Sequence, residues 1–270
     1  MTALITLSSD FGTRDSYVAE LKGVLLSEGP PDLRLIDLSH ELAPFDVQAA
    51  AWFVRVALPR FPAGTVHLVV VDPGVGSARR ALVVQLPMMT LVGPDNGLFS
   101  QLYDGREVVY AIDPERLGTR NISRTFHGRD LFAPVAAQLA AGVSAASFGP
   151  RIESYQRMRT PLVEMVGDVL HGHVMHVDHF GNLISDLSEA TLRDFLDLDG
   201  PLSAAPERLR VRLGEHVVKR VVDHYAEAEP GQLVALVGSS GLLELSLREA
   251  SAALELGIDV GHTVSVMRRG

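Results

Sequence analysis

The chain has 270 residues, of which 47% are hydrophobic and 21% charged, with 24 glycines and 15 prolines. This composition is that of a globular protein and excludes collagen, coiled coil and disorder. No cysteine is present, which excludes disulfides, thiolate nucleophiles, cysteine-ligated zinc and iron–sulfur clusters. The formal net charge of −9 disfavours partners such as nucleic acid or an anionic membrane, although a local basic patch remains compatible with it.

The first half alternates short β-branched runs with helical patterns. Strands are predicted at residues 4–7, 33–36, 66–71, 81–85 and 90–92, and helices at residues 17–26, 46–58 and from residue 131 onwards. The apolar run VHLVVV at residues 66–71 is typical of a strand that is covered on both faces. The pattern predicts an N-terminal α/β domain, residues 1–160, with a central, mostly parallel sheet.

After about residue 161 the runs become short, β-rich and separated by turn residues. They lie at residues 167–177, 209–213, 216–222, 233–237 and 263–267. This texture predicts a smaller C-terminal domain, residues 161–270, built from antiparallel β-strands.

Two features bear on the location of the protein. The N-terminal residues MTALITLSSDFG have no basic region followed by an apolar core, so no signal peptide is predicted. Residues 131–150 are uncharged over a length that could cross a bilayer. They are mostly alanine, glycine and serine, with Pro134 and Gln138 inside, which favours a buried helix followed by a loop. We therefore expect a soluble, cytoplasmic protein.

Four aspartates follow predicted strands of the first half, namely Asp10, Asp37, Asp72 and Asp95. Ligands of open α/β sheets bind beyond the carboxyl ends of the strands, so several of these carboxylates are expected to share one rim. Each of them alone could equally cap a helix or build a turn.

A glycine-rich turn, DPGVGSARR, begins at Asp72. It lacks the third glycine of a dinucleotide fingerprint and the lysine of a phosphate loop, which disfavours a nucleotide phosphate site. The turn can bring Asp72 and Arg79 together, either as a surface ion pair or as part of a site. His127, beside a glycine and before a helix, is a candidate general base or an ordinary loop histidine.

Histidines gather at His171, His173, His176 and His179. The first two would point the same way from a strand, which is a spacing that metal sites use. No HExxH pair is present, and a surface face explains the histidines equally well. No metal is therefore expected here, and a metallohydrolase stays an alternative that a chelator would test.

Seven stretches, in order from residue 4 to about residue 257, resemble one family. They are SSDFGTRDSYVAELKGVL, IDLSHELAPFDVQAAAW, VVVDPGVGSARRALVV, LVGPDNGLFS, TFHGRDLFAP, VDHFGNLISDL and VGSSGLLELSLREASAALELG. The family is that of the S-adenosyl-L-methionine hydrolases, or hydroxide adenosyltransferases, grouped with the chlorinases and fluorinases. The resemblance implies an N-terminal α/β domain, a smaller C-terminal β domain and a homotrimer with sites between subunits.

The resemblance also implies roles for single residues. Asp72, Arg79 and His127 match the catalytic Asp–Arg–His set of the hydrolases, whereas halogenases carry tyrosine in place of the aspartate. Asp10 matches the carboxylate that binds the ribose diol. The other implied substrate-binding residues are Phe45 and Phe126, which line the pocket, and Asp178, Phe180, Asn182, Ser239, Glu244 and Leu247 of the C-terminal domain.

The implied reaction is attack of water on ribose C5′, which yields adenosine and L-methionine. The leaving group is a neutral thioether, so no general acid and no cofactor are expected. Either Asp72 or His127 could take the proton of the water. The alternatives are a binding sensor for S-adenosylmethionine or adenosine with negligible turnover and a halide adenosyltransferase.

Overall fold

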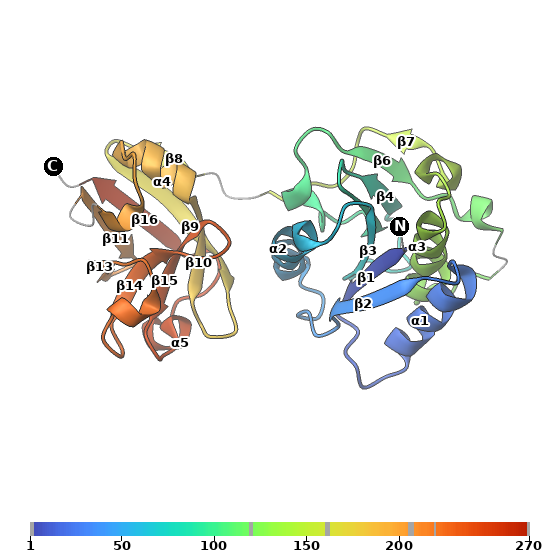
Figure 1. The fold of residues 1–270 in the computed structure, drawn as a ribbon, viewed down its shortest axis with the longest axis horizontal. Helices are drawn as coiled ribbons and strands as arrows, with labels where there is room; N and C mark the ends of the chain where they lie inside the picture. The colour runs from blue at the N-terminus through green and yellow to red at the C-terminus, as the bar shows by residue number, and fades with distance from the viewer. Residues whose placement is uncertain (1–2, 119–120, 160–162, 205–207, 219, 269–270) are drawn as a thin grey trace. The chain divides into compact units, whose positions relative to one another are not determined.

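The computed structural model describes residues 3–118, 121–159, 163–204, 208–218 and 220–268. By its internal contacts the chain divides into two compact units, Met1–Met158 and Arg159–Gly270 (Figure 1). The domain boundary predicted between residues 160 and 161 lies outside the described residues. Together the two units give a mixed α/β protein with two sheets.

The described part of the N-terminal unit holds a seven-stranded sheet in the order β2-β1-β3-β5-β4-β6-β7. The strands are β1 (Leu4–Ser9), β2 (Arg34–Ser39), β3 (Thr65–Val70), β4 (Ala81–Gln85), β5 (Met89–Pro94), β6 (Val108–Ala111) and β7 (Arg151–Ile152). Strands β2, β1, β3 and β5 pair in parallel. Strands β5, β4, β6 and β7 pair antiparallel, so one half of the sheet is parallel and the other is not.

Helices cover both faces of this sheet. Helices α1 (Tyr17–Glu28) and α3 (Ala133–Ala140) share one hydrophobic cluster, and α2 (Val47–Ala57) belongs to another. The strand β3 alternates between the two clusters, with Leu68 and Val70 in the first and Val69 in the second. Burial on both faces is the reason for its continuous apolar sequence.

The C-terminal unit holds the second sheet, in the order β12-β11-β16-β9-β10-β15-β14-β13, with β8 paired to β9. The strands are β8 (Glu164–Val166), β9 (Val169–Val177), β10 (Leu183–Ser188), β11 (Leu209–Leu213), β12 (His216–Val218), β13 (Arg220–Val221), β14 (Leu233–Val237), β15 (Leu242–Leu247) and β16 (Thr263–Arg268). Most of its pairings are antiparallel, and β13 with β14 is parallel.

Two helices of the C-terminal unit were not predicted, namely α4 (Glu189–Leu196) and α5 (Ala252–Leu256). Serine hydroxyls cap both: Ser188 accepts from the N–H of Thr191, and Ser251 from that of Leu254. The β-rich run predicted at residues 167–177 is confirmed as strand β9, except that its first two residues form the turn of a hairpin with β8, where Gly167 has φ +59°.

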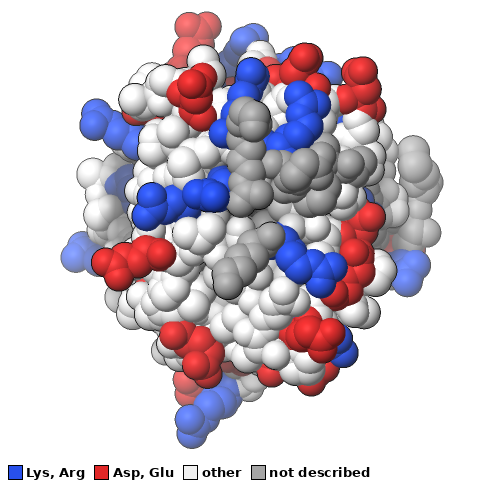
Figure 2. Space-filling view, turned by 90° about the vertical axis from the view of Figure 1, so that its left-hand side faces the viewer, with Lys and Arg blue, Asp and Glu red and all other residues white. Residues whose placement is uncertain are grey.

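The uncharged stretch at residues 131–150 contains α3 and the 3-10 turn Ala145–Phe148. Within the described ranges, no helix has the length and apolar character that crossing a bilayer requires. Figure 2 shows one face of the molecule, on which basic and acidic side chains are interspersed.

Candidate active site

A cavity of about 540 Å³ opens in the N-terminal unit, and we call it the N-terminal pocket. Its lining residues are Asp10, Phe11, Tyr17, Glu20, Pro44, Phe45, Val70, Asp72, Val75, Ser123, Thr125, Phe126, His127, Gly128 and Arg129. Of the four aspartates predicted at strand ends, Asp10 and Asp72 line the pocket. Asp37 and Asp95 do not line it and form ion pairs elsewhere in the unit.

Asp72, Arg79 and His127 form one continuous chain of contacts. Nε of Arg79 donates to Oδ1 of Asp72 at 2.8 Å, and Nη2 of Arg79 donates to Oδ2. The same Nη2 lies 2.8 Å from Nδ1 of His127, a residue 48 positions further along the chain. The fold thus brings His127 into contact with Arg79, which already pairs with Asp72 across the glycine-rich turn.

A glycine allows the turn after β3 to reach His127. Gly76 has φ +78°, which side chains of L-residues rarely tolerate. A Cβ atom at this position would lie 2.4 Å from the carbonyl oxygen of Arg124. The turn that carries Arg79 therefore presses against the segment that carries His127.

The cluster is withdrawn from solvent. The side chains of Asp72 and Arg79 are only 5% and 9% exposed, and the Arg79 guanidinium lies 5.2 Å from the ring centre of Phe132. Burial and the positive charge of Arg79 lower the pKa of His127, against the opposing charges of Asp72 and Asp130. His127 is therefore neutral at neutral pH.

Asp10 and Phe45 meet at the mouth of the same pocket. Oδ2 of Asp10 accepts a hydrogen bond from the backbone N–H of Phe45 at 2.9 Å. Phe45 has φ +65°, and the residue is 73% exposed. A bulky residue in the left-handed region is strained by about 1–3 kcal/mol, and such strain clusters at ligand sites.

Phe126 belongs to an aromatic group with Phe11 and Tyr17. The ring centres lie 5.7 Å from Phe11 and 5.2 Å from Tyr17, both in edge-to-face geometry. All three residues line the N-terminal pocket. They form an apolar wall beside the polar cluster.

A second cavity, of about 580 Å³, lies in the C-terminal unit, and we call it the C-terminal pocket. Its lining residues are Asp178, Phe180, Asn182, Tyr225, Leu247, Arg248, Glu249, Ala250 and Ser251. Oδ1 of Asp178 accepts from the backbone N–H groups of Phe180 and Asn182, and Oδ2 accepts from Nδ2 of Asn182. In this turn Phe180 is 74% exposed.

Two predicted residues do not line the C-terminal pocket, namely Ser239 and Glu244. Glu244 is buried, and its Oε1 accepts from the hydroxyl of Tyr225 at 2.6 Å and from Ser246 at 2.8 Å. Burial and the hydrogen bond to Glu244 raise the pKa of Tyr225. Sequence reasoning missed Tyr225, because its partner lies 19 residues away in an unrelated segment.

The histidine-rich stretch forms no metal centre within the ranges that the structure describes. Nδ1 of His171 contacts the hydroxyl of Ser265 at 3.0 Å, and the backbone N–H of His173 donates to Asp186. His179 stacks edge-to-face with Phe180.

A cavity that combines an apolar wall with two aspartates and a histidine, the histidine and one aspartate both in contact with Arg79, is typical of the active site of an enzyme. More specifically, the chain belongs to the SAM hydroxide adenosyltransferase family. Residues 5–149 match the model of the N-terminal domain of the family, and residues 172–265 match that of the C-terminal domain. The resemblance stated from the sequence is therefore confirmed.

Known proteins resemble the chain over its whole length. A protein of Thermus thermophilus named (R)-S-adenosyl-L-methionine hydrolase is 39% identical, over 96% of this chain and 97% of its own. A fluorinase of an Actinoplanes species is 27% identical, over 98% of this chain and 97% of its own. The crystal structure of an uncharacterized conserved protein from Thermotoga maritima has a TM-score of 0.87 and 31% identity, covering 98% of this chain and all of that one.

Proposed function

We propose that this protein hydrolyses S-adenosyl-L-methionine to adenosine and L-methionine. The observation that carries the proposal is the chain of contacts from Asp72 through Arg79 to His127, of which Asp72 and His127 line the N-terminal pocket. Membership of the family and the hydrolase name of the Thermus relative support it. A cytoplasmic location is part of the proposal.

In the proposed reaction a water oxygen attacks C5′ of the ribose in line with the bond from C5′ to sulfur. The new C–O bond forms as the C–S bond breaks, and its electron pair stays on sulfur, which becomes the neutral thioether of methionine. The water loses one proton. The sulfonium is already a good leaving group, so the side chains of the protein suffice and no cofactor is proposed.

We assign the proton to Asp72 rather than to His127. A guanidinium only donates hydrogen bonds, so Nδ1 of His127 must accept from Arg79, and the neutral ring carries its proton on Nε2. Such a histidine has no free lone pair, whereas each carboxylate oxygen of Asp72 keeps one beyond its bond to Arg79. The Nε2–H of His127 is then free to donate to the attacking water.

The charges in the cluster suit this reaction. Arg79 stabilises the hydroxide character that develops on the water, and its own charge is balanced by Asp72. A hydroxide-like nucleophile and a cationic sulfonium neutralise each other in the transition state, which a dry pocket favours. Alignment of water, carbon and sulfur contributes up to about 7–11 kcal/mol.

We propose that Asp10 binds the two ribose hydroxyls. Its Oδ2 already accepts from the N–H of Phe45, which fixes the carboxylate while leaving lone pairs on both oxygens for a diol. The parallel half of the N-terminal sheet is the platform for this half of the site, since Asp10 and Asp72 follow neighbouring strands. The exposed ring of Phe45 and the ring of Phe126 offer apolar contact to the nucleoside.

We propose that the C-terminal pocket supplies the rest of the site, with Asp178, Phe180, Asn182 and Leu247 in contact with adenine or methionine. Two observations support this proposal: each unit has a cavity with carboxylate side chains in its lining, and each cavity carries a highly exposed phenylalanine. The family resemblance suggests that the pockets of neighbouring subunits combine in a homotrimer. Ser239 and Glu244 are then proposed to act from behind the pocket.

A halide adenosyltransferase is less well supported than a hydrolase, because halogenases have tyrosine at the position where this chain has Asp72. A sensor without turnover would have no need for the buried Asp–Arg–His chain.

The deciding experiment incubates purified protein with S-adenosyl-L-methionine in chloride buffer with a chelator, and separates the products by chromatography and mass. Adenosine and methionine in equal amounts support the hydrolase. A 5′-chloronucleoside supports the halogenase, and bound but unconverted substrate supports the sensor. Loss of turnover with chelator would instead reopen a metal-dependent reaction.

A further inference from the structure

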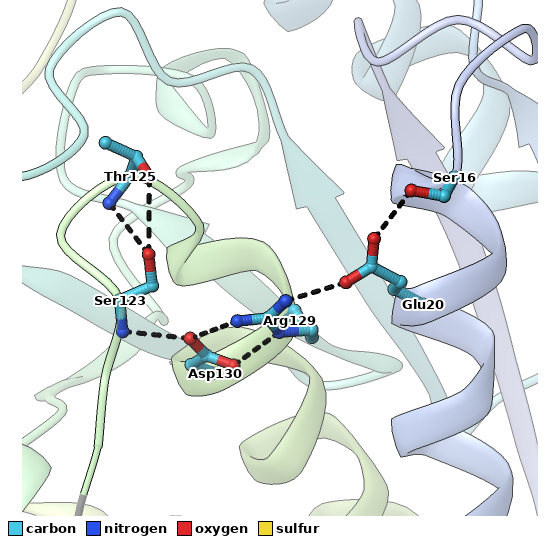
Figure 3. Close-up of polar contacts among 6 residues, drawn as sticks. All are labelled: Ser16, Glu20, Ser123, Thr125, Arg129 and Asp130. Atoms are coloured by element: carbon cyan, nitrogen blue, oxygen red, sulfur yellow. Dashed lines mark hydrogen bonds and ion pairs between the residues drawn. The ribbon is translucent and has the colours of Figure 1, made fainter.

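The segment that carries His127 is tied to helix α1 by the guanidinium of Arg129 (Figure 3). Nη1 of Arg129 donates at 2.6 Å to Oε2 of Glu20, which lies in α1 and 109 residues earlier in the chain. Nε and Nη2 donate to the two carboxylate oxygens of Asp130 at 2.6 and 2.9 Å. One side chain thus joins two segments that are remote in sequence.

The two carboxylates that accept hydrogen bonds from Arg129 also accept hydrogen bonds from other residues. Oδ2 of Asp130 also accepts from the backbone N–H of Ser123 at 2.9 Å, which joins the two ends of the segment 123–130 (Figure 3). The second carboxylate oxygen of Glu20 accepts from the hydroxyl of Ser16 at 2.7 Å. Each carboxylate therefore has a partner besides Arg129, and the direction in which it faces the guanidinium is fixed.

Both neighbours of His127 are held by the same arrangement. The guanidinium of Arg129 lies 5.0 Å from the ring centre of Phe126, whose edges meet Phe11 and Tyr17. On the other side, a Cβ atom at Gly128 would lie 3.0 Å from the ring of Phe11. His127 therefore lies between two residues that are closely packed, so its own backbone has little room to move.

The backbone after His127 needs such support. Residues Gly128–Phe132 form a π-helical turn, a rare conformation that occurs frequently at functional sites. Arg129 lies inside this turn. Exposed ion pairs contribute little stability on average, so a partly exposed network of this geometry is better explained by a positional role.

We propose that Arg129 is a positioning residue that keeps His127 in hydrogen-bonding contact with Arg79. It acts through the backbone of residues 126–128 and through its tie to Glu20. This inference rests on the proposed function, in which His127 directs the attacking water. Arg129 would matter for the rate of the chemical step and little for binding of the substrate.

The first test compares the kinetics of Arg129→Gln, Arg129→Lys and Glu20→Gln. Arg129→Gln is expected to lower kcat about 10- to 100-fold, the effect of a small displacement in an active site, with KM and substrate affinity little changed. Glu20→Gln removes only the tie to α1 and is expected to lose less. The matched control is Arg106→Gln, which breaks a similar arginine–aspartate pair in an exposed turn and should keep full kcat.

The second test needs no turnover and follows the titration of His127 by NMR, with its signal assigned from its loss in His127→Gln. The groups that face His127 are Arg79, Asp72 and Asp130. In Arg129→Gln we expect the ring of His127 to lose its contact with Arg79, and the pKa of His127 then rises toward its ordinary value. Arg129→Lys keeps the positive charge but loses the two-pronged contact with Asp130. If the pKa of His127 also rises in this variant, the cause is the changed position of the ring and not the lost charge.

The outcomes separate the possible roles. A raised KM with unchanged kcat would make Arg129 a substrate contact and overturn the proposal. A lower melting temperature with unchanged kcat and an unchanged His127 titration would reduce Arg129 to a structural residue. Should Arg129→Gln fail to fold, the milder Glu20→Gln decides by the same two readouts. Should the wild-type protein not convert S-adenosylmethionine, the proposed function fails, while the titration still tests the contact between His127 and Arg79.

Discussion

Nη2 of Arg79 lies 2.8 Å from Nδ1 of His127. Because a guanidinium has no lone pair to offer, this contact fixes the direction of the hydrogen bond and with it the tautomer of the ring. The neutral histidine then presents a donor at Nε2. A residue that sequence reasoning treats as a candidate base is, in this geometry, a donor, and the carboxylate of Asp72 is the acceptor nearest to it in the contact chain.

This assignment predicts different losses for two conservative variants. Asp72→Asn keeps the size of the side chain but removes its basicity, and is expected to lower kcat about 10²- to 10⁴-fold. His127→Gln retains a donor near the place of Nε2 but loses the geometry of the ring, and is expected to lower kcat by only about 10- to 100-fold, less than Asp72→Asn. Steady-state kinetics on both variants, with Asp104→Asn in an exposed turn as the control, checks it. A reversed order of the two losses would return the role of base to His127.

Arg79→Lys is expected to lose most of the activity although the charge is kept. The planar guanidinium contacts both oxygens of Asp72 and the ring of His127, whereas one ammonium cannot reproduce this fork. We expect kcat to fall about 100-fold. In Arg79→Gln the positive charge that lowers the pKa of His127 is removed as well, so this pKa should rise, and on acidification the remaining activity should be lost at a higher pH than in the wild type. An unchanged pH–rate profile would show that Arg79 does not govern the state of His127.

Phe45 offers a test of strain at the site. Its backbone has φ +65°, which asparagine tolerates better than phenylalanine. Phe45→Asn is therefore expected to leave the free energy of unfolding unchanged or to raise it by up to about 1 kcal/mol. The exposed ring is lost at the same time, so KM for S-adenosylmethionine should rise. Phe45→Leu keeps the strain and loses the ring, and should raise KM without stabilising the fold.

The local patterns of the sequence predicted the N-terminal strands and helices well, because burial on one or two faces leaves a clear period in the residues. The run that became β3 is the best example, since its side chains alternate between two cores. Strands β6 and β7 were not predicted because they are short. The runs that became β4 and β5 were predicted as strands, but their antiparallel pairing was not, so the sheet is less parallel than predicted. Helices α4 and α5 were missed because they are short and lie among β-rich runs.

The candidate site, too, was predicted only in part from the sequence. Motif resemblance named Asp72, Arg79 and His127, and the fold brings them into contact. No pattern of spacing could give the direction of the hydrogen bond between Arg79 and His127. Nor could it reveal the tie from Arg129 to Glu20 or the pairing of Tyr225 with Glu244, because these contacts depend on how distant segments pack.

Tyr225→Phe tests the support of the C-terminal pocket. The change removes one donor to the buried carboxylate of Glu244 and leaves Ser246 as its hydroxyl partner. We expect the free energy of unfolding to fall by about 1 kcal/mol. Affinity for S-adenosylmethionine should fall about fivefold, the equivalent of about 1 kcal/mol. Tyr155→Phe breaks a similar hydroxyl–glutamate bond in the N-terminal unit, and as the control it should leave the affinity unchanged.

His67 makes the stability of the N-terminal unit dependent on pH. Burial in the core lowers the pKa of this residue from 6.5 to about 4, and its Nδ1 contacts the hydroxyl of Thr6 at 2.6 Å. As the pH falls below 6.5 the unfolded chain takes up the proton first, so the contribution of His67 is complete above that pH and is lost on the way to pH 4. Between pH 7 and pH 5 the loss is about 2 kcal/mol. Urea unfolding of wild type and His67→Gln at both pH values measures it: the stability advantage of the wild type should shrink by this amount, whereas a constant difference would mean that His67 is not held neutral in the folded protein.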